Sequence, residues 1–220
     1  IPEGRTFGVL GGTGSGKSTV VQLLSRLYEL KDSRGSICIG GREIRDIPIE
    51  ELRRNIGTVL QEPFLYSRTI RENISASVPD ASMEEIRYAA QIACIDDAIM
   101  SFPDGYDTLV GERGVTLSGG QKQRCAFARA VVCGPKIIFA DEPTGALDSH
   151  SARVLLEIIS QLHEDLETTV FMVTHDAFCA SYAERILFLK DGKIFNELVK
   201  GEKTRGVFYH EILDVLSLLG

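Results

Sequence analysis

The segment from Gly11 to Ser18 has the pattern G-x-x-x-x-G-K-S and stands between an extended apolar stretch and a helical pattern. Glycines allow successive backbone N–H groups to face one anion, and a helix that starts directly after them adds its positive end. Lys17 can reach the β and γ phosphates of a nucleotide, and the Ser18 hydroxyl can bind magnesium. The pattern predicts a phosphate-binding loop rather than a glycine-rich turn without a ligand. Its candidate binding residues are Gly11, Gly12, Thr13, Gly14, Ser15, Gly16, Lys17, Ser18 and Thr19.

Two adjacent carboxylates, Asp141 and Glu142, follow the short apolar run 137–140. An unbroken apolar run of this length is typical of a buried parallel strand, and successive side chains at a strand end point to different sides. The pair can therefore divide two tasks. Asp141 would bind magnesium, directly or through water, and Glu142 would polarise an attacking water. The alternative is a solvated acidic turn, which is the weaker interpretation beside a phosphate-binding loop.

Residues 117–124, Leu-Ser-Gly-Gly-Gln-Lys-Gln-Arg, resemble the signature motif of the ABC-type ATPases. They lie between the phosphate-binding loop and the acidic pair, as in that family. Ser118 and the N–H groups of Gly119 and Gly120, followed by Gln121, would open a helix whose positive end meets the γ-phosphate held by an opposite subunit. Each chain would then supply half of each site. Taken without its neighbours, Ser-Gly-Gly is more often a simple helix cap.

The same resemblance assigns roles to residues that follow other expected strands. Gln61 resembles the Q-loop glutamine, which touches magnesium and couples to the membrane partner, and residues 146–148 resemble the D-loop. His175 resembles the switch histidine that contacts the γ-phosphate. The alternatives are a polar strand end for Gln61 and a satisfied surface or core histidine for His175. Residues 107–114 are similar to a loop that contacts the membrane domains in exporters of the family, with a solvated charged loop as the alternative.

The elements that must position these residues alternate between strands and helices, which indicates an α/β protein. The predicted fold class is a P-loop NTPase core with a mostly parallel sheet flanked by helices, plus an inserted α-helical subdomain that carries the signature motif. The predicted organisation is one ATPase domain: a RecA-like core at 1–62 and 134–200, the helical subdomain at 63–133 and a C-terminal helix at 201–220. Strands are expected at 5–10, 35–39, near 44, 56–60, 137–140, 169–174, 185–189 and 193–198, and helices at 17–30, within 80–102, at 118–132, 151–162, 178–182 and 208–219.

Composition limits the classes of protein that remain. The 220 residues are 44% hydrophobic and 25% charged, as in an ordinary globular protein. The net charge of -7 argues against a nucleic-acid partner, because neutralising phosphates needs clustered lysine and arginine. Five cysteines without a C-x-x-C spacing predict buried thiols in a reducing compartment. No apolar run approaches the roughly 20 residues of a bilayer span. We therefore expect a cytoplasmic chain, peripheral on the inner face of the cell membrane, and the resemblance implies a bacterial one.

The resemblance covers nearly the whole chain but changes in character along it. Up to about Val132 the sequence is similar to exporters whose membrane and ATPase parts are fused, and from Pro135 onward it is similar to detached ATPase subunits of antimicrobial-peptide resistance and detoxification transporters. We therefore expect a chimera, engineered or recombined. Members of the family also carry preceding antiparallel strands with an aromatic residue that stacks on adenine, and these are expected to be missing here. Because such stacking is worth about 1–3 kcal/mol per base in nucleic-acid binders, we expect weaker nucleotide affinity and an uncovered sheet edge.

Together these patterns predict ATP hydrolysis that depends on Mg2+ and powers transport through transmembrane permease partners. The working unit would be a nucleotide-sandwich dimer, either a homodimer or a heterodimer of ATPase domains. Glu142, Lys17 and His175 are the predicted catalytic residues, and Ser18, Gln61 and Asp141 the predicted magnesium ligands. One alternative is a non-transport ABC ATPase acting on DNA or ribosomes, which the acidic charge disfavours. The other is a truncated or engineered domain that folds and binds nucleotide with little or no turnover.

Overall fold

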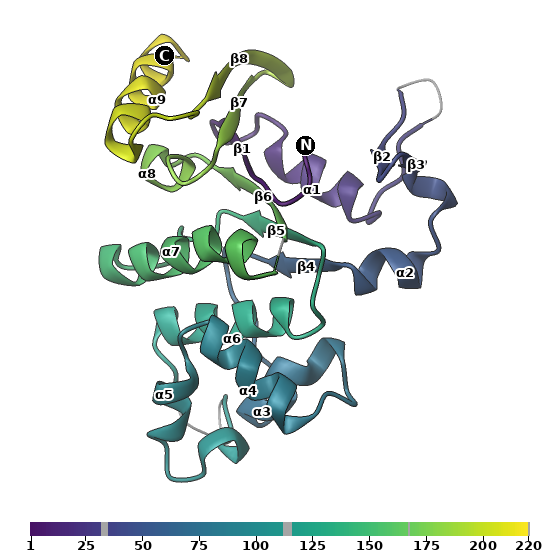
Figure 1. The fold of residues 1–220 in the computed structure, drawn as a ribbon, viewed down its shortest axis with the longest axis vertical. Helices are drawn as coiled ribbons and strands as arrows, with labels where there is room; N and C mark the ends of the chain where they lie inside the picture. The colour runs from purple at the N-terminus through teal and green to yellow at the C-terminus, as the bar shows by residue number, and fades with distance from the viewer. Residues whose placement is uncertain (32–34, 112–115, 167, 220) are drawn as a thin grey trace.

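A six-stranded sheet forms the centre of the fold, with helices on both of its faces (Figure 1). The computed structural model describes residues 1–31, 35–111, 116–166 and 168–219. The strand order is β4-β5-β6-β1-β7-β8, in which the first five strands are parallel and β8 runs antiparallel to β7. The predicted α/β class with a mostly parallel sheet is therefore confirmed.

The elements have the following bounds. The strands are β1 (Thr6–Gly11), β2 (Cys38–Ile39), β3 (Arg42–Glu43), β4 (Ile56–Val59), β5 (Ile137–Asp141), β6 (Thr169–Thr174), β7 (Arg185–Lys190) and β8 (Lys193–Val199). The α-helices are α1 (Lys17–Leu24), α2 (Ile49–Arg54), α3 (Ile70–Ile74), α4 (Met83–Ile92), α5 (Asp96–Met100), α6 (Gly119–Val131), α7 (Ser149–Leu166), α8 (Ala177–Ala180) and α9 (Arg205–Leu219). Short 3-10 turns are η2 (Ile44–Asp46), η3 (Ser75–Ser77) and η4 (Gly105–Asp107).

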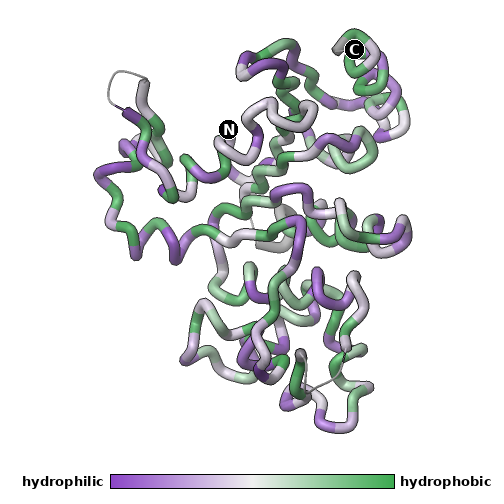
Figure 2. The backbone as a smooth tube through the Cα atoms, turned by 180° about the vertical axis from the view of Figure 1, so that it is seen from behind, coloured by the Kyte–Doolittle hydropathy of each residue, from purple (hydrophilic) through white to green (hydrophobic). Residues whose placement is uncertain are grey.

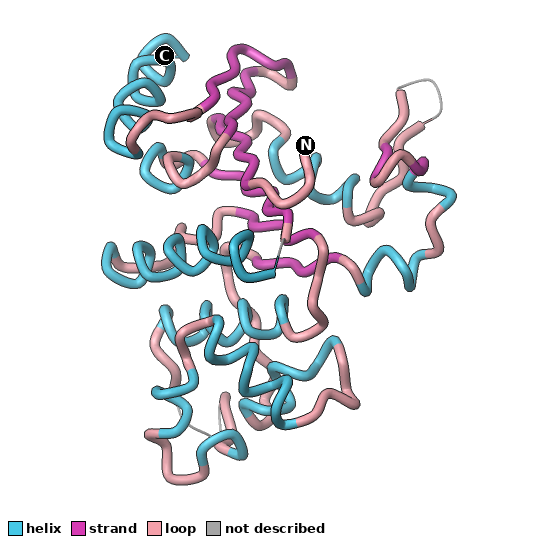
Figure 3. Tube along the Cα trace, in the orientation of Figure 1, coloured by secondary structure: helices cyan, strands magenta, loops and turns pink. Residues whose placement is uncertain are grey.

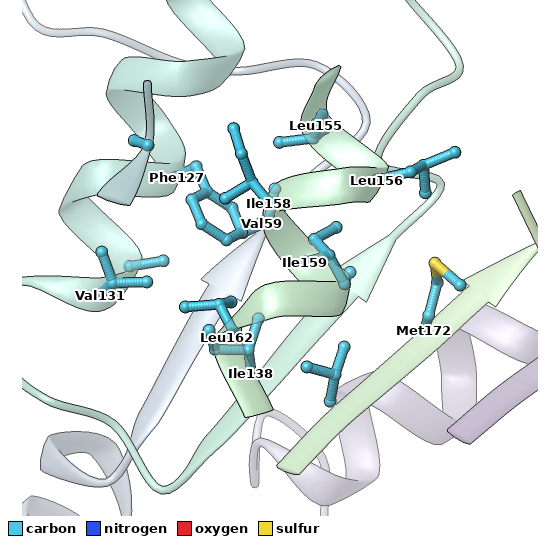
Figure 4. Close-up of a cluster of buried hydrophobic side chains, with 14 of the residues drawn as sticks. Val59, Phe127, Val131, Ile138, Leu155, Leu156, Ile158, Ile159, Leu162 and Met172 are labelled. Atoms are coloured by element: carbon cyan, nitrogen blue, oxygen red, sulfur yellow. The ribbon is translucent and has the colours of Figure 1, made fainter. Parts of the chain in front are cut away.

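The central strands are apolar on both faces because both faces are covered. In Figure 2 the central strands of the sheet are mostly green, the colour of hydrophobic residues. Leu10, Ile138 and Met172 belong to the larger core together with side chains of α6 and α7, and Figure 4 shows Phe127 of α6 in this cluster. The alternate side chains, such as Val9, belong to a second core with α1. Since neighbouring side chains on a strand point to opposite faces, α1 and α6 cover opposite faces of the sheet.

Helices α3 to α6 gather at the end of the molecule away from α9 (Figure 3). Asp96, at the start of α5, fixes part of this group because it is buried and accepts a hydrogen bond of 2.6 Å from the Tyr106 hydroxyl and one of 3.2 Å from Arg87 Nε. Burial alone would raise the pKa of Asp96, but the hydrogen bonds from Tyr106 and Arg87 outweigh it, so that the pKa is lowered. None of the helices in the described ranges has the length and apolar character that crossing a bilayer requires.

The ends of several elements differ from the prediction. The helix predicted at 17–30 ends at Leu24, because Arg26 takes a left-handed conformation (φ 49°) and its guanidinium donates hydrogen bonds to the carbonyls of Ile44 and Ile47. Ile44 begins a 3-10 turn instead of a strand. The region 80–102 contains two helices, α4 and α5, separated at Cys94, which also has a positive φ. Local periodicity carries no information about these long-range contacts.

The prediction of buried cysteines was wrong for part of the set. Cys125 and Cys179 are buried, and burial raises the pKa of each thiol to about 12. Cys38 and Cys94 are exposed, since they lie in the β2 hairpin and at the left-handed turn after α4.

Gly57 on β4 lies directly against the backbone of Ala130 on α6. A Cβ atom on Gly57 would collide with the Ala130 carbonyl oxygen. We expect Gly57→Ala to lower the free energy of unfolding by about 1–3 kcal/mol, because overpacking forces the strand and the helix apart. Chemical denaturation measures this change. The control Gly206→Ala adds the same methyl to α9, where nothing lies within 4 Å, and is expected to be neutral or slightly stabilising. Unchanged stability of Gly57→Ala would contradict the close contact.

Candidate active site

The loop between β1 and α1 curls around the Lys17 side chain. Gly14 and Gly16 have φ of 80° and 99°, a left-handed region that glycine adopts without steric cost. Lys17 Nζ donates hydrogen bonds of 2.8 Å and 3.0 Å to the carbonyls of Gly11 and Gly12, and the residue is only 6% exposed. A buried ammonium group is therefore held at the mouth of a glycine loop, where α1 also begins. This is the geometry that a polyphosphate needs.

Two oxygen-bearing side chains meet beside this loop. The Ser18 hydroxyl, at the start of α1, donates a hydrogen bond of 3.3 Å to Asp141 Oδ1 at the end of β5. Burial raises the pKa of Asp141, and neighbouring Glu142 adds to this effect, while Ser18 and Lys17 oppose it. Burial makes ionisation of this carboxyl group costly, but a divalent cation beside it would favour the ionised form. Magnesium prefers oxygen ligands of this kind. The donor set of Ser18 and Asp141 fits a magnesium ion.

Glu142 lies at the centre of the site and is held on both of its carboxylate oxygens. Its backbone is left-handed, with φ of 48°. Oε1 lies 3.7 Å from Lys17 Nζ, and Oε2 lies 2.8 Å from His175 Nδ1. Oε2 also accepts hydrogen bonds of 3.2 Å from the Thr174 hydroxyl and from the His175 backbone N–H. Thr174 was not predicted from the sequence; its position as the last residue of β6, directly before His175, is the signal that indicates it.

The topology explains why these residues meet. Strands β5, β6 and β1 are neighbours in the sheet and parallel, so that the loops after them emerge at one edge, where ligands bind in open α/β sheets. A cavity of about 370 Å³ lies at this edge. Its lining adds residues of β7 and α9 that the sequence did not indicate. The cavity is lined by Gly11, Gly12, Thr13, Gly14, Ser15, His175, Leu189, Lys190, Asp191 and Leu216.

The signature residues lie elsewhere in the chain's own fold. Ser118 is the N-cap of α6, where its side chain accepts a hydrogen bond from the Gln121 backbone N–H and its own N–H donates to Gln121 Oε1. A Cβ on Gly119 would lie 3.6 Å from the Ala146 carbonyl, beside the predicted D-loop. Helix α6 covers the face of the sheet opposite to α1, and among the described residues no hydrogen bond joins Ser118 to the phosphate-binding loop.

Gln61 follows β4 and lies against the turn after Glu142. Its Nε2 is 2.8 Å from the position that a Cβ on Gly145 would take. Within the described ranges, no hydrogen bond joins Gln61 to Ser18 or Asp141, so its role at the metal remains a prediction. The structure therefore brings together Lys17, Ser18, Asp141, Glu142 and His175, and leaves Gln61 and the signature residues outside this group.

The structure describes the predicted D-loop and part of the loop predicted at 107–114. Asp148 of the predicted D-loop accepts hydrogen bonds of 3.0 Å from the backbone N–H groups of His150 and Ser151, and so caps α7. In the loop predicted at 107–114, Asp107 pairs with Arg71 at 3.1 Å. Residues 112–114 lie outside the described residues, and the role of this loop toward membrane domains remains a prediction.

Comparison with known proteins agrees with this geometry. Residues 1–145 match the ABC transporter family. The ABC transporter ATP-binding protein YknU of Bacillus subtilis, described as uncharacterized, is 44% identical over 217 residues, which are 97% of this chain and 36% of that protein. The mitochondrial iron-sulfur clusters transporter atm1 of Aspergillus fumigatus is 41% identical over 88% of this chain and 26% of its own length.

A solved structure of a bacterial Atm1-family ABC exporter with ATP bound is also similar. Its TM-score is 0.83 at 34% identity, and the match covers 99% of this chain and 37% of the exporter chain. This chain thus spans about a third of the length of several relatives that it matches. Because the family match, the fold and the grouping of Lys17, Glu142 and His175 all agree, the chain belongs to the ABC transporter family, as an ATP-binding domain of the kind that hydrolyses ATP.

Proposed function

We propose that this chain hydrolyses ATP with the help of Mg2+ as one half of a nucleotide-sandwich dimer, and that hydrolysis drives transport across a membrane. The observation that carries the proposal is the position of Glu142. One carboxylate oxygen lies beside the phosphate-loop Lys17 and the other beside His175. A base, a cation and a switch histidine at one end of a glycine loop are suited to phosphoryl transfer to water.

Each of these side chains has a distinct task in the proposed reaction. The backbone N–H groups of 11–16 and Lys17 bind the β and γ phosphates and offset their charge. Glu142 accepts a proton from the water that attacks the γ-phosphorus, as the bond to the ADP oxygen breaks. His175 stabilises the charge on the γ-phosphate oxygens. Thr174 holds Glu142 through the hydrogen bond to Oε2 and so limits the directions in which the carboxylate can turn.

Ser18 and Asp141 are the residues that would hold magnesium, and Gln61 would join them after a movement of its side chain. The bound cation would neutralise charge between the β and γ phosphates. In this structure the Ser18 hydroxyl and Asp141 Oδ1 already lie 3.3 Å apart, next to Lys17. The pair supports the proposal because both side chains lie beside the phosphate-binding loop.

In this proposal the site needs a second chain, because the helix that Ser118 opens packs on the face of the sheet opposite to α1. The N-terminus of α6, opened by Ser118, Gly119 and Gly120, carries a partial positive charge that would attract an anion. A second copy, or a related ATPase domain, would place this helix end on the γ-phosphate. Both composite sites then form together, as in a closed two-fold assembly.

The wider assembly is proposed from the relatives. YgaD of Bacillus subtilis, 44% identical over 88% of this chain, is named a multidrug export ATP-binding/permease protein. We propose that this chain works at the cytoplasmic face of a membrane with transmembrane permease domains, and that 63–133 is the subdomain that transmits motion to them. The acidic net charge favours protein partners over nucleic acid.

The dimer makes a distinct kinetic prediction. The rate of MgATP hydrolysis per chain is expected to rise with protein concentration, because only dimers contain a complete site, and to become constant once all chains are paired. Removal of Mg2+ with EDTA is expected to abolish turnover. A phosphate-release assay over a hundredfold range of protein concentration measures both effects. No hydrolysis by the parent chain would contradict the proposed activity, and a rate per chain that does not depend on concentration would contradict the dimer.

A further inference from the structure

Gln123, in the second turn of α6, is a fully buried polar side chain that the proposed reaction does not use. Its exposure is 0%. The side-chain amide Nε2 donates hydrogen bonds of 2.9 Å to the Leu60 carbonyl and of 3.0 Å to the Pro143 carbonyl. Both acceptors are carbonyl oxygens, and only the NH2 end of an amide can donate to two of them, so that its orientation is fixed.

The two carbonyls belong to the residues next to the predicted chemistry. Leu60 directly precedes Gln61, and Pro143 directly follows Glu142. The Gln61 side chain itself lies on Gly145, in the turn where the Gly145 N–H donates to the Glu142 carbonyl. One side chain of α6 thus joins the ends of two parallel strands at the points where the metal and base residues leave the sheet.

A second side chain of α6 holds the other end of the Gln61 segment. Arg129 Nη2 donates a hydrogen bond of 2.8 Å to the Phe64 carbonyl, and Arg129 Nε donates one of 2.9 Å to the Asn73 carbonyl. Gln61 therefore lies between two backbone carbonyls, those of Leu60 and Phe64, that are both fixed to the same helix. A movement of α6 must carry this segment with it.

Within the described part of the chain, Gln123 satisfies two backbone carbonyls and leaves one of its own atoms unsatisfied. Its Oε1 atom is buried and has no hydrogen-bond partner among the described residues. An unsatisfied buried oxygen costs about 1–3 kcal/mol, which offsets part of what the two donated hydrogen bonds contribute to stability. The gain from Gln123 lies in the geometry that its two donated hydrogen bonds impose on the carbonyls of Leu60 and Pro143.

We propose that Gln123 is a positioning residue through which α6 sets Gln61 and Glu142 for hydrolysis. This inference rests on the proposed function. The Ser118 end of α6 meets the nucleotide of the opposite site, while Gln123 on the same helix holds the base and the metal candidate of its own site. Binding at one site therefore adjusts the catalytic geometry of the other through one rigid helix.

The test compares two variants that lack the donor but pack differently, Gln123→Met and Gln123→Ala, with Val131→Ala. Val131 is a buried residue of α6, and its truncation lowers stability without touching either carbonyl. Both Gln123 variants are expected to lower kcat by roughly 10- to 100-fold, since small misplacements of catalytic groups have effects of this order. KM for MgATP should change by less than about threefold, because the phosphate contacts remain. Val131→Ala is expected to keep the parent kcat. A loss of kcat that follows the loss of Tm across all three variants would overturn the inference.

Amide hydrogen exchange of the nucleotide-free chains tests the link without any turnover. Exchange of the hydrogen-bonded amides of Gly145 and Leu147 should be faster in both Gln123 variants than in the parent and in Val131→Ala, because local opening is no longer restrained there. Unchanged exchange would overturn the link, and faster exchange with an unchanged kcat would overturn its positioning role. An inactive parent with faster exchange in the Gln123 variants would contradict the proposed function and support the link.

Discussion

Replacement of Glu142 by glutamine is expected to reduce the rate of ATP hydrolysis by roughly 100- to 1,000-fold, the usual size of a general-base contribution, while MgATP still binds. The amide keeps the shape of the carboxylate and can still accept the hydrogen bonds from Thr174 and the His175 backbone at its oxygen. It cannot accept the proton of the attacking water. Because binding continues without hydrolysis, Glu142→Gln should also accumulate as a dimer when MgATP is present. Phosphate release and size-exclusion chromatography with MgATP measure the two effects.

The matched control for this change is Glu202→Gln. Glu202 is exposed in the segment between β8 and α9, and the same removal of one negative charge there should leave turnover and dimer formation unchanged. If Glu142→Gln retained more than about a tenth of the parent rate, another group would have to act as the base. If it failed to bind MgATP, Glu142 would be needed for the ground state as well, and the assigned role would be wrong.

Much of this site could be predicted because its signals are local. The glycine loop, the acidic pair and His175 each follow a short apolar run, and parallel strands bring their carboxyl ends to one edge of the sheet. Lys17, Ser18, Asp141, Glu142 and His175 accordingly lie together in the structure. The assigned chemical roles remain predictions, since a position at the edge of a sheet does not establish what a group does.

The features that could not be predicted depend on contacts between distant segments. Arg26 ends α1 early by reaching the carbonyls of Ile44 and Ile47, and Gln123 reaches Leu60 and Pro143 from a position that sequence alone describes as a polar residue in a helix. Nothing in the sequence around Gly57 indicates that glycine is needed there, because the reason is the close approach of the Ala130 backbone. Tertiary packing determines such contacts, and they produce no periodic pattern in the sequence.

The predicted chimeric origin has no structural test of its own. The alignment with YknU extends over 97% of the chain at 44% identity and so crosses the boundary near 132–135. The core crosses the same boundary, because Phe127 of α6 packs with Ile138 of β5 and Leu155 of α7 in one cluster. Whatever the origin of the chain, the part from Pro135 onward therefore completes the same sheet and the same site as the part up to Val132.

Lys17→Met is expected to reduce kcat/KM for MgATP by roughly 1,000- to 10,000-fold, because two effects combine. Loss of the charge-assisted contact to the phosphates weakens binding by about 1.5–3 kcal/mol, or roughly 10- to 100-fold. Loss of a positive group aimed at the developing charge lowers kcat by about a further 100-fold. Methionine fills the buried space of the lysine stem, so the fold should persist. Nucleotide titration by calorimetry separates the effect on binding from the effect on turnover.

The control Lys136→Met removes an exposed lysine just before β5, at the edge of the sheet opposite to the site, and should leave binding and turnover unchanged. Comparison of the two variants distinguishes a specific phosphate contact from a general loss of positive charge, which matters in a chain whose net charge is already -7. Lys17 also lies 3.7 Å from Glu142 Oε1, so its removal leaves the carboxylate with only the contacts of Oε2 to Thr174 and His175. The double variant Lys17→Met with Glu142→Gln should therefore lose less than the product of the single losses. Independent, multiplicative losses would show that the two residues do not act as one unit.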